Sequence, residues 1–499
     1  MASPANLIYR TTGSTILHPL SELLHLSLDQ VNFVVCQLIA LVTAVWFRVY
    51  LSPCHAHTAV RHAFATVLGG YFAIFCFGWY SLHIFTMALV SYCIMAKARI
   101  ENVHRYSFVV AMGYLIVCQI NRVYIFNYGI LSTDFSGPLM ILTQKITTLA
   151  FQLHDGMSKN SEMLTHEQRQ YSVKKRPTFL EHLSYHLNFM SVLAGPCSHF
   201  KDYIAFIEGS HIESKLLNVK LNMNGHYKRP NPSPTAAVLS KLGFCGLMVI
   251  LFLTITKAFP VSKIIDDTFI SEIPLYMRLI YLYIAMQACK PKYYFAWVLA
   301  DAVNNAAGYG FNGVDEKGND RWDLITNLNI WNIEASTSFK MYIDNWNIQT
   351  AAWLKRICYD RVPRYRSGMT FLLSALWHGL YPGYYLTFFT GIPMMLAARV
   401  VRSNFRHFFV SSKSRKFLYD IVTWMATQLA ICYTVTPFVL LAIEPSVKFY
   451  KSVYFYFHIG IFLVLVLLPV KPSKRSQKQP SKQTALHSAN HTSDNRSYL

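Results

Sequence analysis

The fold is decided by a 30-residue run without Asp, Glu, Lys or Arg at positions 369–398, which reads MTFLLSALWHGLYPGYYLTFFTGIPMMLAA. A helix needs about 20 mainly apolar residues to cross the hydrocarbon core of a bilayer. The run is therefore long enough for a membrane hairpin, and the turn-forming pair Pro382-Gly383 near its middle predicts where the hairpin breaks.

Uncharged runs of this kind recur along the chain, at 33–46, 64–96, 106–121, 182–200, 242–256, 279–289, 421–443 and 452–470. The run at 64–96 has room for two short spans that turn near residues 78–81. Two less regular segments, 135–154 and 293–311, contain Lys145 and Asp301. We expect about ten to twelve membrane segments, some of them re-entrant. All should be helical, because lipid-facing backbone cannot leave its hydrogen bonds unmade.

The predicted fold class is thus an all-α, polytopic transmembrane protein. A transmembrane β-barrel would show ten-residue segments of alternating hydrophobicity, whereas these runs are continuous. Composition agrees, since 53% of the residues are hydrophobic and 14% are charged, against about 25% charged in soluble domains. This composition argues against a soluble enzyme.

The chain is strongly basic, with 46 Lys and Arg against 25 Asp and Glu, a formal net charge of +21. Three anionic partners fit this charge: the cytoplasmic leaflet, an anionic small molecule, or nucleic acid. The apolar composition argues against nucleic acid. For any single basic loop, fixing the topology of the membrane segments is a sufficient explanation.

Ten cysteines lie mostly inside apolar runs and show no Cys-x-x-Cys spacing. This pattern predicts neither a disulfide framework nor a structural zinc site. Residues 1–30 carry Arg10, Glu22 and Asp29, and the first apolar run starts after them. We therefore expect that the chain has no cleaved signal peptide. Its insertion into the membrane should use a span that the mature protein retains.

Residues 1–470 are predicted to form a single multi-span membrane domain. Two stretches within it, 155–178 and 201–233, are polar enough to lie outside the bilayer. Residues 471–499 have low complexity and carry six basic residues against one acidic residue. We expect this segment to be a disordered, basic, cytosolic tail.

His378 is the first candidate for chemistry, because it lies in the middle of the uncharged run 369–398. An ionisable residue at membrane depth is a functional candidate by default, although a histidine hydrogen-bonded to a neighbouring helix would look the same. Desolvation favours neutral imidazole, the state that a general base requires. Gly379 would allow a substrate to approach closely. Ser374, one helical turn earlier, could form a Ser–His pair, but the run supplies no carboxylate to orient it.

Residues 339–356 form the second candidate segment. Apolar residues at 339, 343, 346, 353 and 354 make a helical stripe opposite cationic and amide side chains. The segment could be an amphipathic interfacial helix with tryptophan anchors. Alternatively, an amide on it could enter the protein interior and meet His378, since an amide offers donors and an acceptor without a charge. Periodicity cannot choose between Asn345 and Asn347.

Several motifs together resemble the membrane-bound O-acyltransferase family, in its lysophospholipid acyltransferase branch. The sequence WNIQT at 346–350 precedes SALWHG at 374–379, so that Asn347 and His378 match the paired Asn and His of that family. The resemblance extends over nearly the whole chain, through YRTTGS at 9–14, DFSGP at 134–138, LAGP at 193–196, YYFAW at 293–297 and GYGF at 308–311.

The resemblance implies an endoplasmic-reticulum membrane enzyme of about eleven spans that acts in phospholipid remodelling. It would transfer an acyl group, such as oleoyl, from acyl-CoA to the free hydroxyl of a lysophospholipid. Lysophosphatidylethanolamine and lysophosphatidylserine are the implied acceptors. His378 and Asn347 would be the catalytic pair, with acyl-CoA as co-substrate, membrane lipids around the protein, and no cofactor or metal.

We expect His378 to take the proton of the attacking hydroxyl and Asn347 to hold a reactant or the developing oxyanion. Ser374 and nearby aromatic residues are predicted to line the substrate tunnel: Trp346, Trp353, Trp377 and Tyr381. Two rival functions are a polytopic transporter and a lipid-binding membrane protein without acyl transfer. A transporter would be expected to place acidic residues within its long apolar runs, and the runs above contain none.

Overall fold

A computed structural model describes residues 11–125, 135–158, 161–222 and 232–470. Within these ranges the regular secondary structure is helical, with two isolated β-bridges and no strand. The prediction of an all-α fold is therefore confirmed. The predicted tail at 471–499 lies outside the described residues.

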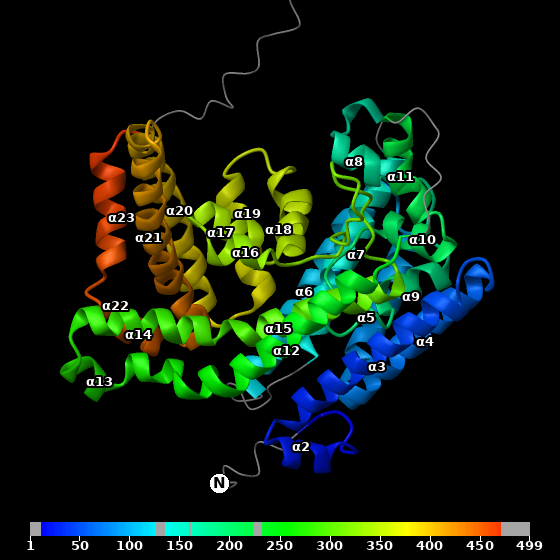
Figure 1. Cartoon of the computed structure of the whole chain (residues 1–499). Coiled ribbons are helices and arrows are strands. Elements are labelled where there is room, and N and C mark those ends of the chain that lie inside the picture. The colour runs from blue at the N-terminus through cyan, green and yellow to red at the C-terminus, as the bar shows by residue number, and fades with distance from the viewer. Residues whose placement is uncertain (1–10, 126–134, 159–160, 223–231, 471–499) are drawn as a thin grey trace, which may run out of the picture.

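Two blocks built mainly of long helices flank a centre of short ones (Figure 1). The first block, blue to cyan, contains α2 (His18–Leu24), α3 (Leu28–Tyr50), α4 (Thr58–Phe77), α5 (Ser81–Lys97), α6 (Val103–Ile125), α7 (Ser136–Met157) and α9 (Phe179–Leu187). The second, orange to red, contains α20 (Pro382–Phe409), α21 (Lys413–Leu440), α22 (Ile443–Ser452) and α23 (Tyr456–Leu467).

Green helices run across the base of both blocks in Figure 1: α12 (Thr235–Ala258), α13 (Asp267–Glu272), α14 (Leu275–Ala288) and α15 (Lys290–Ala307). Short helices fill the centre: α16 (Ile330–Glu334), α17 (Phe339–Asn345), α18 (Ile348–Leu354), a π-helical turn (Lys355–Tyr359) and α19 (Arg366–His378). Three more lie on the upper right: α8 (His166–Tyr171), α10 (Phe200–Glu208) and α11 (His211–Asn222). Both candidate residues are thus on the central helices.

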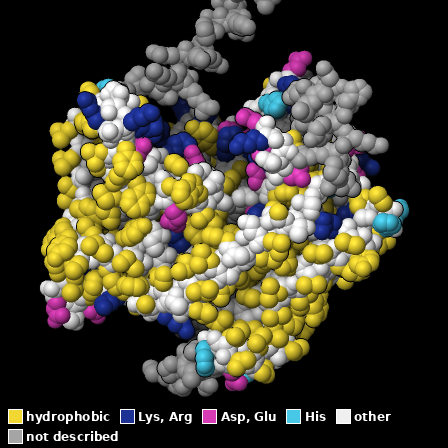
Figure 2. All heavy atoms as spheres, in the orientation of Figure 1, with side chains coloured by type: hydrophobic (Ala, Val, Ile, Leu, Met, Phe, Trp, Pro, Cys, Tyr) yellow, Lys and Arg dark blue, Asp and Glu magenta, His cyan; other side chains and the backbone are white. Residues whose placement is uncertain are grey.

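The helices on the outside of the protein are apolar enough to cross a membrane. Six described segments meet the length and hydropathy requirements, or seven if α22 and α23, which meet at 73°, form one span. Hydrophobic side chains accordingly cover much of the face seen in Figure 2. The protein is a multi-pass membrane protein, while the count of ten to twelve segments stays a prediction.

Both predicted breaks within long uncharged runs are found. The run 64–96 is interrupted by a 3₁₀ turn at Gly78–Tyr80, between α4 and α5. The run 369–398 is interrupted between the end of α19 at His378 and the start of α20 at Pro382. With 13 residues, α19 is too short to cross a bilayer.

The two charges inside the less regular segments are paired within the protein. Lys145 of α7 is 1% exposed, and its ammonium donates to the carbonyl oxygen of Tyr185 at 3.1 Å and to Ser191 Oγ at 2.5 Å. Asp301 of α15 accepts from Lys241 Nζ of α12 at 2.7 Å. These charges therefore hold elements together and do not face lipid.

The expectation that every membrane segment is helical is wrong for residues 188–199. The run 182–200 begins as α9 but continues as turns and extended chain. Tyr185 Oη donates to the carbonyl oxygen of Ser198 at 2.5 Å, and Asn304 Nδ2 donates to the carbonyl oxygen of Met190 at 3.2 Å. Because neighbouring side chains satisfy its polar groups, this backbone does not need a helix.

The expectation of one amphipathic helix over 339–356 is also wrong. The chain forms α17 and α18, with a break at Trp346 and Asn347. Asn347 has a left-handed backbone with φ of 51°, a conformation that asparagine adopts more readily than most residues. Asn327 holds the break open, because its carbonyl oxygen accepts from Ile348 N at 2.9 Å.

Gly69 allows α4 to lie directly on the non-helical segment that follows α9. Phe189 N donates to the carbonyl oxygen of Ala65 at 3.1 Å, and a Cβ at Gly69 would overlap the carbonyl oxygen of Leu187. We therefore expect Gly69→Ala to lower the melting temperature of the purified protein by several degrees or to prevent folding. Gly113→Ala is the matched control, since nothing lies within 4 Å of its added methyl group. Equal melting temperatures for both variants would contradict this close approach.

Candidate active site

His378 is the last residue of α19, and its ring is surrounded by aromatic side chains. Its ring centroid lies 5.5 Å from Phe388 of α20 and 5.0 Å from Phe438 of α21. Tyr384 and Trp377 follow at 5.8 and 4.7 Å. His378 is half-buried, and its ring hydrogen-bonds to none of the described residues. The imidazole therefore lies in apolar surroundings with both ring nitrogens available.

Gly379 ends α19 with a backbone that disfavours a side chain. Its φ is 131° and its ψ is −172°, values that glycine adopts readily and other residues do not. An added Cβ would also come within 3.4 Å of Tyr384 Cε2. The glycine thus allows the chain to turn away directly after His378.

Asn347 lies at the N-terminus of α18 and presents an unbound amide. Its side chain is partly exposed and makes no hydrogen bond to any described residue. Asn345, the alternative that the periodicity left open, is occupied. Its Nδ2 donates to the carbonyl oxygen of Met341 at 2.7 Å, and its Oδ1 accepts from Asn332 at 3.2 Å. Of the two amides, Asn347 is therefore the one available to a ligand.

Helix α7 holds both α18 and α19. Gln144 Nε2 donates to Thr350 Oγ1 at 2.9 Å, and Trp353 Nε1 donates to Thr147 Oγ1 at the same distance. The indole of Trp377 donates to the carbonyl oxygen of Met140 at 3.0 Å. The helices that carry the two candidate residues are thus fixed to one polar face of α7.

The structure brings together some of the predicted tunnel residues. Trp353 and Trp377 contact each other with ring centroids 5.7 Å apart, and Tyr381 lies 5.6 Å from Tyr384, which contacts His378. Trp346 is in a different cluster, where it packs against Trp297 at 5.6 Å. The tunnel itself stays a prediction.

No hydrogen bond joins Ser374 to His378, although Ser374 is buried on the same helix. The geometry therefore gives no support to a Ser–His nucleophilic pair. Asn347 and His378 likewise share no hydrogen bond. Their helices contact each other through the indoles of Trp353 and Trp377.

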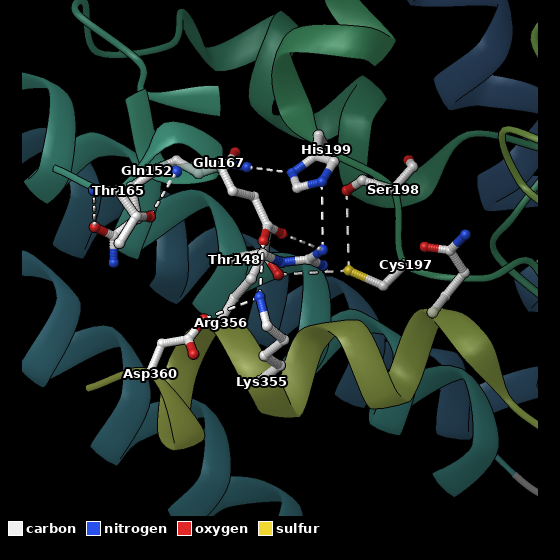
Figure 3. A network of polar contacts seen from close by, with 12 residues as sticks. Thr148, Gln152, Thr165, Glu167, Cys197, Ser198, His199, Lys355, Arg356 and Asp360 are labelled. Carbon is white, nitrogen blue, oxygen red and sulfur yellow. Dashed lines mark hydrogen bonds and ion pairs between the residues drawn. The ribbon is translucent and has the colours of Figure 1, made fainter. Parts of the chain in front are cut away.

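A polar network surrounds the π-helical turn that follows α18 (Figure 3). Lys355 Nζ donates to Glu167 Oε2 at 3.0 Å and lies 3.2 Å from Asp360 Oδ2. Arg356 Nη1 donates to His199 Nε2 at 3.3 Å. Because a guanidinium can only donate, a neutral His199 ring accepts on Nε2 and carries its proton on Nδ1. The contact of Nδ1 with the Gln152 amide at 2.6 Å then requires that the amide oxygen, and not its nitrogen, faces the ring. These contacts fix the end of α18 to α7, α8 and the segment before α10.

The cavity inside this network has a volume of about 30 Å³, and charged and amide side chains line it together with Phe151 and Ile357. Tyr171 lines it, stacked on His199 with ring centroids 3.4 Å apart. Burial, helped by the negative charge of Asp202, raises the pKa of Tyr171 to about 12, so the hydroxyl is protonated at physiological pH. A cavity of this size holds water and no lipid.

Basic side chains continue through the connection between α18 and α19. Arg361 forms two hydrogen bonds to Asp155, at 3.0 and 2.6 Å, whereas Arg364 and Arg366 are exposed. Lys and Arg side chains also gather along the upper edge of the view in Figure 2. The connection between the two candidate residues therefore offers cations to an anionic group.

Sequence reasoning missed the rings that surround His378. Phe388 lies in the same uncharged run, and helical spacing does not place it beside the histidine because α19 and α20 are separate helices. Phe438 belongs to α21, 60 residues away along the chain. Neither residue carries a signal in the sequence that distinguishes it from ordinary packing.

Comparison with known proteins gives a consistent result. The model of the membrane-bound O-acyltransferase family matches residues 120–439. Membrane-bound glycerophospholipid O-acyltransferase 1 of Homo sapiens is 62% identical over 477 residues, 96% of each chain. Membrane-bound glycerophospholipid O-acyltransferase 2 of Homo sapiens is 56% identical, over 93% of this chain and 89% of its own. Lysophospholipid acyltransferase 6 of Drosophila melanogaster is 40% identical, over 92% of this chain and 63% of its own.

Proposed function

The chain belongs to the membrane-bound O-acyltransferase family, and from this premise we propose that it transfers a fatty acyl group from acyl-CoA to the free hydroxyl of a lysophospholipid. The observation that carries the proposal is the match, over almost the full length, to relatives named glycerophospholipid O-acyltransferases. The multi-pass architecture fits an enzyme whose acceptor resides in the bilayer.

His378 is the proposed general base. Its apolar surroundings favour the neutral imidazole, which is the form that accepts a proton. As the lysophospholipid hydroxyl attacks the thioester carbonyl, its proton passes to His378. The ester C–O bond forms, the C–S bond breaks, and the CoA thiolate takes the proton back from the imidazolium. Direct transfer between two bound substrates requires no acyl-enzyme.

Asn347 is proposed to bind a reacting group through its amide. The amide is unbound and partly exposed, so it does not have to break a bond within the protein first. An N–H directed at the thioester oxygen would stabilise the oxyanion that develops there. Its place at the start of α18 holds this amide on a rigid element fixed to α7.

The basic connection between α18 and α19 is proposed to attract the phosphates of acyl-CoA. Arg364 and Arg366 are exposed there, and the connection leads directly into the helix that ends at His378. Long-range attraction of this kind raises the rate at which an anionic substrate arrives. The acyl chain would then enter along the aromatic side chains Trp353, Trp377 and Tyr381.

Oleoyl-CoA as donor, and lysophosphatidylethanolamine or lysophosphatidylserine as acceptor, are the proposed substrates. We also propose an endoplasmic-reticulum location, with a cytosolic basic tail at 471–499. The substrates and the location rest on the family resemblance of the motifs, and the cytosolic tail rests on its excess of basic residues.

The test is an assay with the purified full-length protein in lipid nanodiscs. Labelled oleoyl-CoA and a panel of lysophospholipids that differ in head group are supplied, and the labelled phospholipid and free CoA are both measured. We expect one CoA released for each phospholipid formed, with ethanolamine and serine head groups preferred over choline. If the folded protein binds lysophospholipid but forms no labelled phospholipid and leaves acyl-CoA intact, the result would favour the lipid-binding alternative.

A further inference from the structure

The peptide bond directly before His378 is held by a buried glutamine from a distant helix. Gln119 of α6 is 3% exposed, and its Nε2 donates to the carbonyl oxygen of Trp377 at 2.9 Å. The two residues are 258 positions apart in the sequence. Because α19 ends at His378, this carbonyl has no partner within its own helix. Gln119 supplies one, and thereby fixes the peptide plane from which the His378 backbone continues.

A second contact from α6 holds the other end of the same connection. The guanidinium of Arg122 lies over the ring of Tyr381, 5.7 Å from its centroid. Gln119 and Arg122 are three residues apart, so they share one face of α6. A Cβ at Gly379 would lie 3.7 Å from Gln119 Cδ, which shows how closely the amide approaches the chain on the far side of His378. The segment 377–381 therefore lies against α6 along its length.

The His378 ring itself is fixed by no hydrogen bond to the described residues. Its direction depends on the backbone that carries it and on the rings around it. Catalytic groups are normally held in place by supporting residues, and an error of about 1 Å can cost about 100-fold in rate. At this site, the hydrogen bond from Gln119 to the preceding peptide is the supporting polar contact.

Gln119 also has a buried oxygen, Oε1, without a partner in the described structure. An unpaired buried acceptor is unfavourable for folding, and in native proteins such a group calls for an explanation. A leucine at this position would remove that cost and fill a similar volume, but it would leave the Trp377 carbonyl oxygen without its partner. The place of the donated hydrogen bond, directly before His378, and not the unpaired oxygen, is therefore what points to a positioning role.

Resting on the acyl transfer proposed above, we infer that Gln119 is a positioning residue for His378: its amide holds the peptide before the histidine so that the imidazole points at the acceptor hydroxyl. The amide acts through the backbone and not through the substrates. Its removal is therefore expected to slow the chemical step and to leave substrate binding nearly unchanged.

The test compares Gln119→Leu with Gln428→Leu. Gln428 is a close match, since it is 2% exposed and its Nε2 donates to the carbonyl oxygen of Glu334 at 3.1 Å, at the end of α16. Its Oε1 is also unpaired. It lies on α21 and binds the end of a helix that does not carry His378. The Gln428→Leu variant therefore measures how much the loss of such an amide lowers stability, without an effect on the histidine.

We expect Gln119→Leu to lower kcat by about 10- to 100-fold, with KM for both substrates within about 2-fold of wild type. Gln428→Leu should keep kcat within about 2-fold. Binding of a thioether analogue of oleoyl-CoA, which has no carbonyl to attack, counts the folded sites in each preparation. We expect full stoichiometry and an unchanged Kd in Gln119→Leu.

Three outcomes would overturn the positioning role. They are equal kcat in the two variants, a change confined to KM, or a loss of analogue-binding sites in proportion to the loss of activity. In each case wild-type protein that makes labelled phospholipid shows that the proposed function stands and the inference alone fails. Wild-type protein that binds the analogue but forms no phospholipid overturns both.

Discussion

Replacement of His378 by alanine should abolish acyl transfer, lowering kcat by at least about 100-fold and up to about 10,000-fold. The rings in contact with the imidazole, Phe388, Phe438, Tyr384 and Trp377, are not bases at neutral pH and cannot replace it. The proton of the attacking hydroxyl would then have no acceptor. The measurement is labelled phospholipid formed per folded protein in the nanodisc assay.

His458→Ala is the control for this variant. His458 is also a partly exposed histidine among aromatic rings, but both of its ring nitrogens are bound, Nδ1 to the Tyr433 hydroxyl at 2.5 Å and Nε2 to Thr390 Oγ1 at 3.2 Å. Its loss should lower stability and leave kcat per folded protein within about 3-fold. If His378→Ala retained as much activity as His458→Ala, the general-base mechanism would have to be abandoned.

The contrast between these two histidines shows what sequence can and cannot reveal. Both lie in uncharged runs, so depth in the membrane does not separate them. The order of motifs around His378 singled it out, and the structure adds the physical difference: His458 is satisfied and His378 is not. Whether a histidine finds hydrogen-bond partners depends on side chains from helices that are distant in the sequence. No local sequence pattern shows this.

The breaks between helices likewise divide into one that local sequence predicts and one that depends on a distant residue. Proline and glycine at 382–383 predicted the end of α19 to within a few residues, because they act locally. The break at Asn347 was missed because it depends on Asn327, twenty residues earlier, whose carbonyl and side chain accept from Ile348 N and Gln349 N. A helical stripe of apolar residues continues through 339–354 regardless of that contact.

The role of helix α7 could not be predicted from its amino-acid composition. In the sequence its segment is a poor membrane span, interrupted by Lys145 and rich in threonine and glutamine. In the structure these polar residues bind the elements that carry the candidate site, through Gln144 to α18 and through Lys145 to the non-helical segment after α9. Its low hydropathy is thus the consequence of its role as the support of the centre.

Asn347→Asp should lower kcat by about 100- to 1,000-fold, which is the usual loss when one oxyanion-stabilising donor is removed. Aspartate has nearly the same shape and also tolerates the left-handed backbone that Asn347 adopts, with φ of 51°. The substitution therefore leaves the break between α17 and α18 intact and changes the chemistry of the amide. An ionised carboxylate cannot donate, and it would repel the charge that develops on the thioester oxygen.

Asn345→Asp makes the same chemical change two residues away and serves as its control. Its Oδ1 can still accept from Asn332, and the variant loses only the donation to the Met341 carbonyl oxygen. We expect kcat per folded protein to stay within about 3-fold, with a modest loss of stability.

Asn347→Gly completes the series, because glycine accepts the left-handed backbone without any side chain. If the amide is what matters, glycine and aspartate at 347 should both fail while the protein folds and binds the thioether analogue. Full activity in Asn347→Gly would mean that the turn, and not the amide, is what the site requires.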